Sequence, residues 1–485
     1  MRLKETEDKK DALFFAFNHS GLAIFLASLT TAIALFTFIT AEVGPVADMG
    51  IYASLGVMLA FVYTLILLPA MISALPIREK PKTRAAQSGS DSIFYRSLSM
   101  IGRATTGHPY IILTVFVVIV AFSIISVMNI RFSYWPLIYF NDEHPIRAST
   151  ETIDQNLGGS INLEVLIDTG EPNGLYDPDL LKRMVDSAEY IQTLQSGDLY
   201  VGKAWSIANV VKEINMALND NDPAYYRVPE TRGHVAQQLL LFENTGSDDL
   251  EMFTDSNFSM SRLSMRVPFT EASDCLAFVD KVSGHFVETY PDAEITITGL
   301  RVILNKTFTN AVVTMARSYI LAFLSVTVLM IFFLGNLRIG ILSMVPNLSP
   351  VVVVLGVMAF LQIELDLFTM LVGSCVLGII VDDTIHFLNA FIKYNEKERD
   401  IKKAIMQSYR TTGSAILITT LALSAGFGVF MLSEMNNLSD FGLVVTIAII
   451  LALIAEFFVV PALLMVFSKL FAVHNGSVEK VPKIR

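Results

Sequence analysis

Eight long apolar runs constrain what this chain can fold into more than any other feature. The hydrocarbon core of a bilayer is about 30 Å thick, so a helix that crosses it needs roughly 20 mostly apolar residues. Runs of this kind lie at 21–41, 47–75, 109–130, 314–334, 339–361, 366–391, 413–433 and 441–468. Backbone polar groups inside a bilayer must be paired internally, which favours helices. The sequence therefore predicts a multi-pass membrane protein with eight spanning helices.

Residues 131–310 have the composition of a soluble domain. They hold 27 Asp and Glu against 13 Lys and Arg, whereas the whole chain has a net charge of −11, so the acidic charge belongs to this segment. Such a charge argues against a nucleic-acid partner. Strands are predicted at 161–168, 199–205, 259–267 and 293–298, helices at 178–195 and 271–289, and a partly helical insert at 207–245. The order strand–helix–strand, repeated after the insert, predicts an α+β ferredoxin-like (porter-type) domain or a split pair of βαβ units.

The distribution of basic residues predicts the orientation. Lys and Arg gather in 77–108, in 392–412 and in the tail, whereas the loops 42–46, 362–365 and 434–440 have none. Basic loops stay cytoplasmic, so both termini are predicted to be cytoplasmic and 131–310 extracytoplasmic, in the inner or plasma membrane. The predicted division is 1–77 (two membrane helices), 78–108 (cytoplasmic linker), 109–130 (one helix), 131–310 (outer domain), 311–471 (five-helix membrane bundle) and 472–485 (cytoplasmic tail).

The first two apolar runs repeat as the last two. A shift of 392 residues aligns them without gaps and superposes Glu42 on Glu434, Asp48 on Asp440, and Pro69-Ala70 on Pro461-Ala462. Similar composition alone does not explain matched loop acids and a matched Pro-Ala pair. Parallel repeats are a transporter architecture. The chain is therefore expected to be the carboxy-terminal part of a two-fold pseudosymmetric transporter, or a half-sized protein that dimerises.

Two adjacent acids in the sixth run are the strongest candidates for chemistry. Asp382 and Asp383 lie at membrane depth, where a charged side chain is costly. Gly378, Asp382 and His386 share one helix face, and the acids and the histidine can each gain or lose a proton. Glycine at 378 allows close approach of another helix. The alternative, a helix cap at the cytoplasmic interface, is disfavoured because apolar residues continue past the acids. A proton relay of Asp382, Asp383 and His386 is predicted.

Other polar residues in the apolar runs are weaker candidates. Thr419, Thr420 and Ser424 could support the relay, although membrane Ser and Thr more often bond to their own helix. Glu456 falls where the first copy has Thr64, and it is explained equally well by snorkelling, a helix contact or coupling. Asn347, between two prolines, is interpreted as the mark of a kinked helix. The two cysteines, Cys275 and Cys375, are too different in environment to suggest a disulfide.

Three stretches carry a resemblance to a known family. Val345-Pro-Asn-Leu-Ser-Pro350, Leu365-Asp-Leu-Phe-Thr-Met370 and Gly378-Ile-Ile-Val-Asp-Asp383-Thr-Ile-His386 resemble the resistance-nodulation-division (RND) superfamily, and most closely the MMPL-type exporters related to Patched and Dispatched. The resemblance implies twelve membrane helices, two porter domains, and export of lipids or other hydrophobic molecules driven by proton influx. It places the relay acids at Asp382 and Asp383. The matching motif of the amino-terminal half would lie about ten residues before Met1.

Two other functions remain open: a helper of protein secretion with the same fold, and a sterol- or lipid-sensing receptor. A pure sensor gains nothing from acids in the bilayer. The chain lacks a Gly-x-x-x-x-Gly-Lys-Ser/Thr motif and any nucleophile motif, so it is not expected to be an enzyme. No cofactor is expected beyond the proton gradient. The expected partners are membrane lipids, a hydrophobic or amphiphilic cargo, and either an amino-terminal half or a second copy.

Overall fold

The computed structural model describes residues 9–74, 93–132, 135–244, 248–270 and 273–468. The basic residues at 78–84 and in the tail, which support part of the predicted orientation, lie outside these ranges. The chain divides into two compact units. One comprises Met1–Phe132 and Asn310–Arg485, and the other Ser133–Thr309. We call them the membrane unit and the outer unit.

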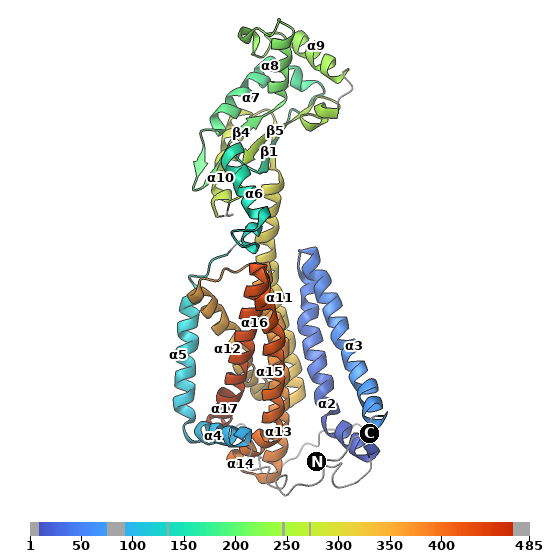
Figure 1. Cartoon of the computed structure of the whole chain (residues 1–485), viewed down its shortest axis with the longest axis vertical. Coiled ribbons are helices and arrows are strands. Elements are labelled where there is room, and N and C mark those ends of the chain that lie inside the picture. Colours follow the sequence, from blue (N-terminus) through green and yellow to red (C-terminus); the bar gives the residue numbers. More distant parts are fainter. Residues whose placement is uncertain (1–8, 75–92, 133–134, 245–247, 271–272, 469–485) are drawn as a thin grey trace. The chain divides into compact units, whose positions relative to one another are not determined.

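Seven of the eight predicted spans are helical segments long and apolar enough to cross a membrane. They are α3 (Gly44–Ala74), α5 (Pro109–Val127), α11 (Leu300–Leu334), α12 (Leu337–Leu361), α13 (Leu367–Glu398) and the continuous segments Ile401–Leu432 and Asn436–Val466 (Figure 1). The first predicted span falls in α2 (Lys9–Phe36) and η1 (Thr37–Thr40), whose apolar part, Ile24–Thr40, is shorter. The multi-pass character is confirmed, and the count of eight stays a prediction.

The last two spanning segments contain π-helical turns. Ile401–Leu432 consists of α14 (Ile401–Ser408), the π-turn η7 (Tyr409–Gly413), α15 (Ser414–Gly428) and η8 (Val429–Leu432). Asn436–Val466 consists of α16 (Asn436–Ile454), the π-turn η9 (Ala455–Val459) and α17 (Val460–Val466). Part of the predicted linker forms an amphipathic helix, α4 (Ile93–Gly107), which packs against α14 and α17.

The sequence repeat is also a structural repeat. The short helix η1 is followed by α3 from Gly44, and η8 is followed by α16 from Asn436, again with an offset of 392. A Cβ atom added to Gly50 would lie 2.7 Å from the Cβ of Phe38, and one added to Gly442 would lie 2.7 Å from the Cβ of Phe430. Each pair of helices therefore crosses at a glycine that no larger residue can replace without movement.

A four-stranded antiparallel sheet forms the centre of the outer unit. Its order is β4-β5-β1-β6, from β4 (Lys203–Trp205), β5 (Met260–Val267), β1 (Ile161–Asp168) and β6 (Glu294–Thr298). The predicted helices are α7 (Pro178–Ile191) and α10 (Ser273–Thr289). The insert holds α8 (Ile207–Ala217), η5 (Pro223–Tyr225) and α9 (Arg232–Glu243). The remaining elements are α6 (Pro145–Leu157), the hairpin β2 (Gln195–Ser196) and β3 (Leu199–Tyr200), and the short helices η3 (Pro136–Tyr139), η4 (Gly174–Tyr176) and η6 (Asp248–Met252).

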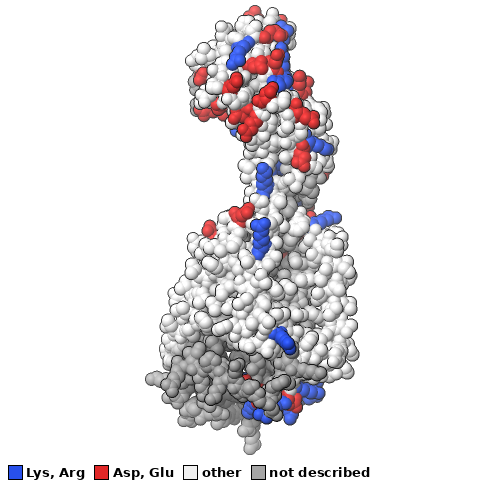
Figure 2. Space-filling model, turned by 180° about the vertical axis from the view of Figure 1, so that it is seen from behind, with Lys and Arg blue, Asp and Glu red and all other residues white. Residues whose placement is uncertain are grey.

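Burial and charge separate the two units. Every second residue of β1, beginning with Ile161, is buried in the core of the outer unit, as period-two alternation requires. Acidic side chains gather on the surface of the outer unit, whereas the visible face of the membrane unit has few charged residues (Figure 2). Cys275 is fully buried in this core, and it is a free cysteine like Cys375. Cys275 is therefore not a site at which an impermeant thiol reagent could test the orientation of the outer unit.

Candidate functional site

Helix α13 carries the predicted relay residues. The side chain of Asp366 caps its first turn by accepting a hydrogen bond of 2.7 Å from the backbone N–H of Thr369. Four turns further on, Nε2 of His386 lies 3.2 Å from Oδ1 of Asp382, which is ion-pair distance for residues one helical turn apart. The same oxygen has no hydrogen bond of good geometry to any described residue. The side chains of His386 and Asp382 are 33% and 42% exposed within the described structure.

Helix α2 packs close to the relay at Gly378. The hydroxyl of Thr31 donates a hydrogen bond of 2.9 Å to the carbonyl of Gly378, and a Cβ atom at Gly378 would lie 3.1 Å from the methyl carbon of Thr31. Gly378 therefore lets α2, a helix of the first copy of the repeat, approach α13, the helix that carries the acids. Asp382 lies on the same face of α13, one turn further along.

A second cluster of polar groups lies around Thr384, the residue that follows the two acids. Oγ1 of Thr384 is 2.7 Å from Oδ1 of Asn347 on α12 and 2.8 Å from Oε2 of Glu456 in η9. Nδ2 of Asn347 donates to the carbonyl of Ser343 over 3.0 Å. The side chains of Asn347 and Thr384 are fully buried, and Glu456 is only 2% exposed. Glu456 is therefore a contact between helices and not a snorkelling residue.

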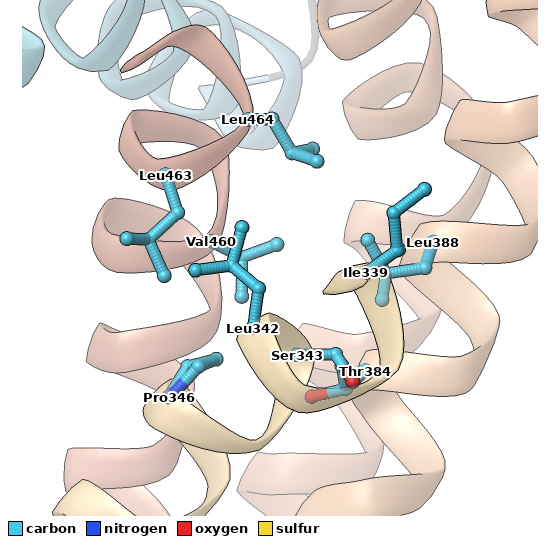
Figure 3. Close-up of a pocket in the computed structure, with 9 residues that line it drawn as sticks. All are labelled: Ile339, Leu342, Ser343, Pro346, Thr384, Leu388, Val460, Leu463 and Leu464. Atoms are coloured by element: carbon cyan, nitrogen blue, oxygen red, sulfur yellow. The ribbon is translucent and has the colours of Figure 1, made fainter. Parts of the chain in front are cut away.

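A small pocket adjoins this cluster. Its volume of about 20 Å³ is enough for one water molecule. Ser343 and Thr384 are its polar lining residues, and the others are apolar: Ile339, Leu342, Pro346, Leu388, Val460, Leu463 and Leu464 (Figure 3).

The proposed supporting residues on α15 are not brought to the acids by any described contact. The hydroxyl of Thr419 donates to the carbonyl of Ile416 in its own helix. Thr420 is buried, and Oγ of Ser424 is buried without a hydrogen-bond partner among the described residues. Helix α15 packs chiefly against α16. The alternative noted from the sequence, bonding to the helix's own backbone, therefore holds for Thr419.

Sequence reasoning missed Thr384 and interpreted Asn347 incompletely. Thr384 lies off the stripe of Gly378, Asp382 and His386, because one residue rotates a helix by about 100°. Asn347 does lie between two prolines in α12, but its side chain links α12 to α13. The sequence shows Asn347, Thr384 and Glu456 only as single polar residues in three apolar segments. Their contacts depend on how the helices pack, and a single sequence carries no signal for that packing.

The described residues hold no cluster of three or more His, Cys, Asp or Glu that could bind a metal ion. The carboxyl, hydroxyl and imidazole groups of α13 and η9 are of the kinds that can bind and transfer protons. Two adjacent carboxyls that interact strongly titrate as a pair.

Two solved structures have a fold similar to that of this chain. The hedgehog release protein Disp from the water bear Hypsibius dujardini superposes with a TM-score of 0.64 and 12% identity, over 93% of this chain and 59% of that one. A SecDF structure superposes with a TM-score of 0.50 and 15% identity, over 96% of this chain and 51% of that one. The chain thus spans little more than half the length of either protein.

Comparison of sequences gives the family. Membrane protein MJ1562 of Methanocaldococcus jannaschii is 21% identical over 384 residues, which cover 76% of this chain and 93% of that protein. The sequence profile of the MMPL family matches residues 2–126 and 270–479, which include α13 and, apart from Val127, all residues of the spanning segments. This chain is a multi-pass membrane protein that belongs to the MMPL family, within the RND superfamily.

Proposed function

We propose that this protein is a proton-coupled exporter of lipids or other hydrophobic molecules. The observation that carries the proposal is the pair of Asp382 and His386, 3.2 Å apart on a spanning helix and next to Asp383. A charged side chain in a bilayer is costly and is usually tied to function. In a protein of the MMPL family, this arrangement fits a proton path better than a structural contact, because a partly exposed pair contributes little to stability.

The remaining expectations form part of the same proposal. The outer unit would be an extracytoplasmic, ferredoxin-like porter domain, which the strand order β4-β5-β1-β6 supports. The termini would be cytoplasmic and the membrane the cell membrane. The proton gradient would supply the energy without another cofactor. The partners would be lipids, a hydrophobic cargo, and either an amino-terminal half or a second copy of the chain.

The proposal is tested by reconstituting the full chain in lipid vesicles that contain a fluorescent phospholipid and a pH-sensitive dye. An imposed proton gradient should drive movement of the phospholipid together with proton flux. Asp382→Asn and Asp383→Asn preserve volume and remove a proton site, so each should reduce both signals to the level of protein-free vesicles.

The matched control is Asp48→Asn, because Asp48 is an exposed acid at the start of α3, outside the site. It should retain both signals. Gradient-dependent movement that persists in the double variant Asp382→Asn/Asp383→Asn would contradict the proposal, and so would its absence in the unmodified chain.

A further inference from the structure

We infer that Glu456 is a third proton-binding carboxyl of this relay and that its proton decides whether Thr384 holds α12 against α13. The inference rests on the proposed function for its role in transport. Its structural part, the protonated state of Glu456 and the contact that depends on it, stands on the geometry alone.

Counting hydrogen atoms around Thr384 gives the protonation state. A threonine hydroxyl has one proton to donate, yet Oγ1 of Thr384 contacts two oxygens, at 2.7 Å and 2.8 Å. Nδ2 of Asn347 is engaged with the carbonyl of Ser343, which leaves Oδ1, an acceptor, facing Thr384. Thr384 therefore donates to Asn347. The contact with Glu456 is a hydrogen bond only if the carboxyl of Glu456 donates, so Glu456 carries a proton.

Burial leads to the same conclusion independently. Glu456 is 2% exposed, and its second oxygen, Oε1, is buried with no hydrogen-bond partner among the described residues. Among the described residues, no Lys, Arg or His forms an ion pair with Glu456, whereas Asp382 has His386 beside it. An unpaired charge in such a place is strongly disfavoured, and the neutral acid is the stable form.

The residues around Glu456 include other titratable groups. Asp383 directly precedes Thr384, whose hydroxyl contacts Glu456. Asp382 precedes Asp383 and lies 3.2 Å from His386. From η7, the hydroxyl of Tyr409 donates to the carbonyl of Phe457, the residue after Glu456. From α12, the neutral side chain of Asn347 completes the cluster.

Release of the proton would change the contact between helices. When Glu456 passes its proton to the carboxylate of Asp383, the negative charge moves the opposite way, from Asp383 to Glu456, and Glu456 becomes an acceptor only. The single proton of Thr384 then turns toward the charged carboxylate, the stronger acceptor. Oδ1 of Asn347 loses its donor, and the polar link between α12 and α13 opens. Protonation of Glu456 is thereby coupled to the packing of two spanning helices.

Infrared difference spectroscopy on the purified full chain tests the structural part without any transport. At neutral pH, the unmodified protein should show the carbonyl band of a buried protonated carboxyl group, and Glu456→Gln should lack it. Thr384→Val should shift this band to higher frequency, because the carboxyl loses its hydrogen-bond partner. Thr384→Ser, which keeps the hydroxyl, should leave the band near its original position.

The outcomes separate the inference from the proposed function. The inference is overturned if Glu456→Gln keeps every carboxyl band of the unmodified protein. It is also overturned if Thr384→Val leaves the frequency of the band unchanged. If those spectra overturn the inference but Asp383→Asn still abolishes transport, the proposed function remains supported. In the vesicle assay, Glu456→Gln should abolish gradient-dependent movement of the fluorescent phospholipid, and retained movement would remove Glu456 from the relay.

Discussion

The two copies of the repeat have the same framework but different chemistry. The first copy is α2, η1 and α3, and the second is α14, η7, α15, η8, α16, η9 and α17. Both place a 3-10 turn and a tightly packed glycine at matching positions. In the most apolar part of α3 no residue is buried within the described structure, whereas 56% of the residues are buried in the most apolar part of Asn436–Val466. Helix α3 is continuous, while its counterpart has a π-turn with Glu456 in place of Thr64. The shared residues build the scaffold, and the difference at Glu456 lets the second copy contact Thr384 on α13, next to Asp383.

A single tyrosine helps to explain the difference in helix geometry. Both copies have a proline, Pro69 and Pro461, which lacks a backbone N–H and leaves the carbonyl four residues earlier without its helical donor. In the second copy that carbonyl belongs to Phe457, and the hydroxyl of Tyr409 donates to it. Position 17, which matches Tyr409, is a phenylalanine with no donor. Tyr409 therefore supports the π-turn that holds Glu456, and such turns are frequent at functional sites.

Replacing Glu456 with the threonine of the first copy should have the largest effect on transport. Glu456→Thr gives the second copy the residue of the first and removes the buried proton site. We expect gradient-dependent movement of a fluorescent phospholipid to fall to the level of protein-free vesicles, while folded protein is retained. Adding Thr64→Glu should not restore movement, because Thr64 is exposed and the one hydrogen bond of its hydroxyl among the described residues is to the carbonyl of Ala60 in its own helix. Full activity in Glu456→Thr would show that the difference between the copies is not functional.

The shared glycines should have nearly equal effects on stability. Gly50→Ala and Gly442→Ala each force a methyl group against a phenylalanine Cβ and a backbone carbonyl of the preceding helix. Overpacking of this kind should cost about 2 kcal/mol in either copy, measured by denaturant unfolding in detergent. Gly426→Ala is the matched control, since a Cβ there meets nothing within 4 Å. A large cost in one copy and none in the other would break the equivalence of the two crossings.

Loss of the tyrosine hydroxyl should have a smaller effect. Tyr409→Phe copies the residue of the first repeat and leaves the carbonyl of Phe457 without the side-chain donor. We expect a cost of about 1 kcal/mol in unfolding free energy. Tyr409 is buried and also packs edge to face against Phe387 and Phe457, and phenylalanine preserves both contacts. An unchanged stability would mean that the π-turn forms without help from Tyr409.

The spans, the repeat and the acidic outer segment could be predicted because each is a local or periodic signal. Strand β1 begins and ends where alternation of apolar residues predicted it, at Ile161 and Asp168. The Asp382–His386 pair followed from one-turn spacing within a single helix. Contacts between helices left no such signal: Thr384 meets Glu456 across 72 positions of sequence. Thr419 was expected to support the relay acids, but its hydroxyl donates to the carbonyl of Ile416 in its own helix.

The weakest effect should come from the threonine that stands in the place of Glu456. The hydroxyl of Thr64 is exposed and donates only to the carbonyl of Ala60 in its own helix, over 2.8 Å. Thr64→Val preserves shape and leaves a carbonyl that already accepts its helical hydrogen bond, so the unfolding free energy should change by less than about 0.5 kcal/mol. The same substitution at Thr384 removes a buried hydroxyl that serves both Asn347 and Glu456, and it should cost about 1–3 kcal/mol. Denaturant unfolding of the two valine variants in the same detergent compares them directly. Equal losses of unfolding free energy in the two variants would show that the contacts of Thr384 with Asn347 and Glu456 add no stability. The contact between Glu456 and Thr384 would then not distinguish the second copy from the first.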